Sequence, residues 1–121
     1  MNKKQQELFR AKLLDLLSET ESAIKMANQR DREISVPRGG DEADMADRIV
    51  NAATAAAQSN RLHSYRKEIL AALGRIESGN YGYCEETGDE IGLERLKANP
   101  VARYSIETQE RIERMKRLHA S

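Results

Sequence analysis

The chain has 121 residues, of which 39% are apolar and 33% are charged, and its 20 basic residues balance its 20 acidic ones. A chain of this size forms one domain without room for a large substrate cavity, so an enzyme that encloses its substrate is disfavoured. The balanced charge disfavours direct DNA binding. With one cysteine and no recognisable signal peptide or membrane span, we expect a cytoplasmic protein without disulfides.

The first predicted helix extends from about Lys3 to Arg32. Its apolar and small residues recur at alternating steps of four and three, which is the pattern of a coiled-coil seam. These seam residues are Phe9, Leu13, Leu16, Thr20, Ala23 and Ala27, with Leu17 and Ile24 beside them. Pro37, Gly39 and Gly40 then interrupt the helical pattern.

A second predicted helix begins at Asp41, which is a good N-cap, and continues to about Ser78 before Gly79 and Asn80. Its expected seam consists of Ile49, Ala52, Ala56, Ser59, Leu62, Arg66, Ile69, Leu73 and Ile76. The two helices, about 45 and 55 Å long, predict an antiparallel coiled-coil hairpin. Seam residues near the turn are mostly alanine, either for helix propensity or to let the helices approach closely.

The predicted turn and the start of the second helix form an acidic tip at residues 39–47. Asp41, Glu42, Asp44 and Asp47 place four carboxylates within seven residues, without a basic residue among them. One or two acids here would serve as a helix cap or as dipole partners. Four exceed that need, so contact with a partner is the favoured interpretation.

Residues 79–121 predict a small turn-rich module, distinct from the hairpin at residues 1–78. A short helix is expected from Leu93 to Ala98, and a last helix is expected to begin near Ser105. The last helix carries three Glu–Arg pairs at favourable i,i+4 spacing. It also has a modest apolar face for packing against the hairpin base, made of Ile106, Ile112, Met115 and Leu118. The predicted fold class is mainly all-α.

Two motifs resemble the DksA/TraR family of bacterial RNA polymerase-binding transcription factors. One is the D-x-x-D-x-A tip at Asp41, Asp44 and Ala46, and the other is the string Y-G-Y-C-x-x-x-G-x-x-I-G-x-x-R-L-x-A-x-P over residues 81–100. The resemblance covers nearly the whole chain. It implies that the hairpin enters the secondary channel of RNA polymerase and that the tip residues alter open-complex stability at particular promoters. The separate N-terminal helical segment of longer members is not expected here.

The zinc site of typical family members is incomplete in this sequence. Their four cysteines correspond to Cys84, Thr87, Ser105 and Thr108, and one thiol with three hydroxyls is a poor zinc site. We therefore expect no metal, with the hydroxyls capping turns and helix ends instead. Cys84 is interpreted as a packed, inert residue, the alternative being an oxidant sensor. Neighbouring glutamates without an adjacent base are expected to raise its pKa.

The resemblance leaves open whether this protein depends on the alarmone guanosine tetraphosphate. In several relatives, residues at three positions bind guanosine tetraphosphate together with the polymerase, a property tied to the stringent response. The corresponding residues here are Glu68, Asn99 and Gln109. These residues lack the cationic groups that a pyrophosphate requires. The nearby basic residues that could substitute are Lys67, Arg95 and Arg103.

The main expectation is a non-enzymatic regulator without catalytic residues, membrane contact or sequence-specific DNA binding. The alternatives are a transcript-cleavage type of factor that positions magnesium in the polymerase active site, for which Glu42 and Asp47 would add ligands, and a coiled-coil adaptor that does not bind polymerase. Small and polar seam residues disfavour strong self-association, so a monomer is expected.

Overall fold

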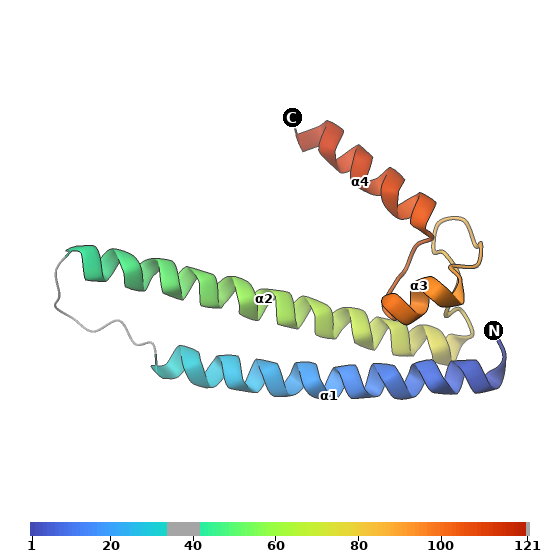
Figure 1. Cartoon of the computed structure of the whole chain (residues 1–121), viewed down its shortest axis with the longest axis horizontal. Coiled ribbons are helices and arrows are strands. Elements are labelled where there is room, and N and C mark those ends of the chain that lie inside the picture. Colours follow the sequence, from blue (N-terminus) through green and yellow to red (C-terminus); the bar gives the residue numbers. More distant parts are fainter. Residues whose placement is uncertain (34–41, 121) are drawn as a thin grey trace. The chain divides into compact units, whose positions relative to one another are not determined.

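The structure, a computed structural model, describes residues 1–33 and 42–120. These residues form four helices: α1 (Lys3–Glu33), α2 (Glu42–Ser78), α3 (Leu93–Ala98) and α4 (Ile106–Ala120) (Figure 1). The predicted mainly α-helical hairpin with a short and a last helix is confirmed, and the helix bounds lie within about two residues of those expected. The predicted N-cap, Asp41, lies outside the described residues. Among the described residues, no helix combines the length and apolar character needed to cross a membrane.

The chain divides into two compact units. The hairpin unit comprises Leu16–Glu68, and the finger unit comprises Met1–Asp15 together with Ile69–Ser121. One boundary between the units lies within α1, and the other lies within α2. The predicted functional division at residue 78 stays a prediction.

In the hairpin unit, α1 and α2 pair side by side in opposite directions (Figure 1). The predicted α1 seam is correct in this unit, because Thr20 is buried and Leu16, Ala23 and Ala27 are half-buried. The Thr20 hydroxyl donates a hydrogen bond of 2.7 Å to the Leu16 carbonyl, which satisfies a polar group inside the seam.

The α2 seam differs from the prediction near the tip. Ile49 and Ala56 are exposed, and Arg48 and Ala55 are half-buried in their place. The expected positions included two successive steps of three. The observed seam alternates four and three throughout, at Arg48, Ala52, Ala55, Ser59, Leu62, Arg66, Ile69, Leu73 and Ile76. A regular heptad keeps one face toward the partner helix, and here that geometry places an arginine at a seam position and an isoleucine in solvent.

In the core of the finger unit, residues of α1 and α2 pack with the loop that follows α2. Phe9, Leu13, Ile69, Tyr81 and Leu96 are all buried. The centroids of the Tyr81 and Phe9 rings lie 5.7 Å apart, a distance typical of stabilising aromatic pairs. Its hydroxyl donates a 2.8 Å hydrogen bond to the Pro100 carbonyl. Burial raises the Tyr81 pKa to about 12, against an opposing effect of the Arg75 charge.

The predicted packing of the α4 apolar face is wrong. Ile106, Met115 and Leu118 are 52%, 51% and 71% exposed, and Ile112 is half-buried. The i,i+4 pairing of Arg111 with Glu107 is also not formed, because Arg111 makes its ion pair with Glu86 in the preceding loop. Contacts of its first two turns, including this ion pair, therefore attach α4 to the rest of the finger unit, and its apolar face contributes little to them.

Candidate functional site

The acidic tip is the first candidate site. Asp44 and Ala46 lie in the first turns of α2 and are exposed, as are Glu42 and Asp47. Acidic groups at this end of a helix complement the partial positive charge of the unpaired backbone N–H groups. The same exposure lets the carboxylates contact a partner. The third predicted tip residue, Asp41, lies outside the described residues.

The second candidate site is the set of four positions that correspond to the family's cysteines. Two of them, Cys84 and Thr87, lie in the loop after α2. The Cys84 N–H donates to the Asp89 carbonyl at 2.7 Å, and the Cys84 carbonyl accepts from Gly88 N–H at 2.9 Å, so the loop closes on itself. The other two positions lie at the start of α4.

The structure brings these four positions together as the correspondence predicts. The Sγ of Cys84 lies 3.5 Å from the Oγ1 of Thr108, within hydrogen-bonding distance for sulfur. The Ser105 hydroxyl donates to the same Thr108 oxygen at 3.0 Å, and Ser105 accepts from the Thr108 backbone N–H at 3.3 Å. Ser105 is therefore the N-cap of α4, as expected. The Thr87 hydroxyl likewise accepts from Asp89 N–H at 3.2 Å.

The pKa of Cys84 differs from the expectation. The residue is buried, as expected for a packed position, and burial raises its pKa. Hydrogen bonds from the Thr87 and Thr108 hydroxyls and from the Ser105 and Thr87 backbone N–H groups together outweigh this effect and lower the pKa to about 6. Hydrogen bonds to a charged form favour that form, so this cluster stabilises a thiolate.

The expectation that the neighbouring glutamates raise this pKa is wrong, since neither is among the causes of the shift, and both glutamates are paired with arginines. Glu85 accepts hydrogen bonds from Arg103 at 2.9 and 3.2 Å and lies 3.7 Å from an Arg75 nitrogen. Glu86 pairs with Arg111. Sequence reasoning missed Arg75, which lies near the end of α2, because no local motif links it to Glu85.

The cluster does not fit a structural zinc ion. Such sites use four charged or strongly basic ligands, typically thiolates and imidazoles. Here one thiol stands with three neutral hydroxyls that already bond to one another or to the backbone. Within residues 1–33 and 42–120, no three His, Cys, Asp or Glu side chains group in a way that could hold a metal.

Comparisons with known proteins give three close matches. A family model described as "Prokaryotic dksA/traR C4-type zinc finger" matches residues 79–114. The RNA polymerase-binding transcription factor DksA of Caulobacter vibrioides is 40% identical, over 98% of this chain and 83% of its own length. General stress protein 16O of Bacillus subtilis is 31% identical, over 93% of this chain and 71% of its own length.

Solved structures agree with these sequence matches. Transcription factor DksA2 from Pseudomonas aeruginosa has a TM-score of 0.84 and 36% identity, covering 97% of this chain and 89% of that one. The Chlamydia trachomatis protein Dks shares the fold at 20% identity and a TM-score of 0.58. Fold and cluster thus define a protein of the dksA/traR C4-type finger class in which three of the four cysteine positions carry hydroxyl residues. The chain belongs to the DksA/TraR family.

Proposed function

We propose that this protein binds RNA polymerase through the secondary channel and modulates initiation at selected promoters. The observation that carries this proposal is the 40% identity, over almost the whole chain, to a relative named as an RNA polymerase-binding transcription factor. In this proposal the hairpin of residues 1–78 enters the channel, and the module of residues 79–121 contacts the enzyme outside it. Such a regulator acts in the cytoplasm as a monomer and performs no chemistry itself.

The proposed effector residues are Asp41, Asp44 and Ala46. The exposure of Asp44 and Ala46 supports this assignment, because a tip that contacts the polymerase interior must present its side chains to solvent in the free protein. Carboxylates at this point can interact with basic side chains or with metal-bound water near the polymerase active site.

We further propose that the finger unit binds no zinc. In this proposal, the regulation of transcription by this protein also does not depend on guanosine tetraphosphate. The hydroxyls of the cluster support the first statement. The second is supported by two of the three basic residues near the alarmone positions. The Arg95 guanidinium donates to the Tyr104 carbonyl at 3.0 Å, and Arg103 pairs with Glu85, so both are engaged within the finger unit.

The experiment combines polymerase binding with transcription. Asp44→Asn keeps the size of the side chain and removes its charge, and Ser18→Ala, an exposed change in the middle of α1, is the matched control. We expect both variants to compete for core RNA polymerase like the wild type, and Asp44→Asn alone to lose regulation of a ribosomal RNA promoter. Wild-type regulation should be equal with and without guanosine tetraphosphate.

The other outcomes separate the alternatives. If Asp44→Asn regulates normally, the acidic tip is only a helix cap. If it abolishes binding, the tip is an anchor and not an effector. If the wild type promotes cleavage of backtracked RNA, the magnesium-positioning alternative holds. If the wild type does not bind polymerase, the adaptor alternative remains.

A further inference from the structure

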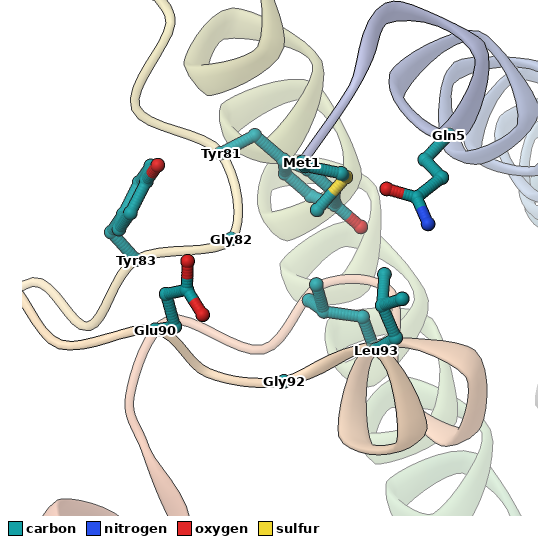
Figure 2. A pocket seen from close by; sticks show the side chains of 9 residues that line it. Met1, Gln5, Tyr81, Gly82, Tyr83, Glu90, Gly92 and Leu93 are labelled. Carbon is teal, nitrogen blue, oxygen red and sulfur yellow. The ribbon is translucent and has the colours of Figure 1, made fainter.

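A small cavity in the finger unit lies apart from both candidate sites. Its volume is about 140 Å³, and it is formed by the start of the chain, the loop after α2 and the first turn of α3 (Figure 2). Pockets for drug-sized ligands enclose about 300 to 1,000 Å³. This cavity therefore suits a single side chain better than a nucleotide or a metabolite.

The backbone around Gly82 shapes the cavity. Gly82 has a φ of +92°, and a Cβ there would lie 2.8 Å from the Cε of Met1 and 3.6 Å from a Leu96 methyl group. Only glycine lets the Met1 side chain lie this close to the loop. The Ile91 N–H donates to the Gly82 carbonyl at 2.8 Å, which holds the two sides of the loop together.

The walls of the cavity are mainly apolar, and its mouth is acidic. The rings and aliphatic groups of Tyr81, Leu93 and Leu96 line it, together with the Gln5 amide. Figure 2 shows the Glu90 carboxylate extending into the space between Tyr83 and Leu93. Tyr83, which is 40% exposed, pairs with Glu90 through an antiparallel bridge and so stands beside the carboxylate.

Glu90 differs from Glu85 and Glu86, the two acidic residues of this loop that form ion pairs. Glu85 and Glu86 are paired with arginines, whereas the Glu90 side chain has no hydrogen bond or ion pair within the described parts of the chain. An apolar group entering the cavity would remove water from this carboxylate without replacing it, which is unfavourable. A cationic group would pair with the carboxylate, and its aliphatic stem would pack on the walls.

We propose that this cavity receives one lysine or arginine side chain of RNA polymerase, with the cationic end at Glu90 and against the Tyr83 ring. An aromatic ring beside a carboxylate favours such a cation. The proposal deepens the proposed function and rests on it, because the partner is the polymerase. It adds an anchoring contact that is separate from the acidic tip.

The test is competition binding to core RNA polymerase at low and at high salt. Glu90→Gln keeps the size of the side chain and removes its charge. Glu94→Gln, an exposed acid on α3 that does not line the cavity, is the matched control. We expect Glu90→Gln to weaken binding about tenfold at low salt and less at high salt, as for the loss of one charge-assisted contact. Glu94→Gln should bind within about twofold of the wild type.

Regulation and structure serve as further readouts. At saturating concentration Glu90→Gln should still regulate a ribosomal RNA promoter, because its acidic tip is intact. Its circular dichroism spectrum and melting temperature should match those of the wild type, since Glu90 is exposed.

The possible results are distinguishable. If the wild type itself does not bind polymerase, the proposed function fails. If the wild type binds and Glu90→Gln binds equally well, the cavity receives no basic side chain and only this inference fails. Equal weakening by Glu90→Gln and Glu94→Gln would indicate a general charge effect and would overturn it. Tighter binding by Glu90→Gln would mean that a neutral group enters.

Discussion

Replacing Thr108 with valine tests whether hydroxyls hold Cys84 as a thiolate. Valine has nearly the shape of threonine and lacks the hydroxyl that lies 3.5 Å from the Cys84 sulfur. A hydrogen bond to a charged group contributes about 1.5 to 3 kcal/mol, and about 1.4 kcal/mol corresponds to one pH unit. Thr108→Val should therefore raise the pKa of Cys84 from about 6 by roughly one to two pH units.

The pKa can be measured directly, because Cys84 is the only cysteine. The ultraviolet absorbance of the thiolate is followed against pH, with Cys84→Ala as the blank that removes the tyrosine contribution. Thr54→Val is the matched control, since the Thr54 hydroxyl donates to the Val50 carbonyl in the hairpin unit. A wild-type pKa at or above the ordinary thiol value of about 8.5, or no change in Thr108→Val, would refute the reasoning.

The same pKa predicts how stability changes with pH. The pKa of Cys84 is lower in the folded protein than in the unfolded chain, so the thiolate adds stability above the unfolded value. This contribution falls as pH drops through the folded value of about 6. Urea unfolding should therefore show that the wild type exceeds Thr108→Val most near pH 9 and least below pH 6. A stability difference that grows as pH falls would contradict the proposed thiolate.

Two further predictions concern the metal and the seam. Protein purified without chelator should contain no stoichiometric zinc and should keep its helical circular dichroism in EDTA; one zinc per chain would contradict the interpretation of the four-position cluster. Ala55→Glu should lower the free energy of unfolding by about 1 to 2 kcal/mol because it places a charge at the half-buried seam, whereas the exposed Ala56→Glu should change it by less than about 0.5 kcal/mol. Equal effects of the two substitutions in urea unfolding would mean that the seam position is misassigned.

The helices were predictable because their limits are set by local chemistry. Pro37 and the glycines before Asp41 end one helical pattern, and Gly79 ends the next. The seam of α1 was also predictable, since its apolar residues already follow the heptad. The tip end of α2 was not, because hydrophobicity favoured Ile49 over Arg48, and a seam that starts at Ile49 includes Ala56 in place of Ala55. At such a position the regular geometry of the paired helices outweighs the character of one side chain.

The finger cluster was predictable in its position and not in its electrostatics. The correspondence with the family's four cysteines located Cys84, Thr87, Ser105 and Thr108, and the helix signals located the Ser105 cap. The low pKa depends partly on backbone N–H groups, whose direction no sequence pattern gives. The arginines that pair with the flanking glutamates also come from distant positions, which no local pattern in the sequence indicates.

In the proposed zinc-free cluster, the thiolate charge is stabilised by hydrogen-bond donors and not by a metal ion. In a zinc finger, the charge of the ion stabilises several thiolates that would otherwise repel one another. With one thiolate, neutral donors suffice: the Ser105 hydroxyl donates to Thr108, and Thr108 can then donate to Cys84. Because Ser105 also caps α4, the same few hydrogen bonds join the loop after α2 to the first turn of α4. The cluster can thus join the same two segments that a zinc ion would join. Its contribution to stability then depends on pH and not on a metal ion.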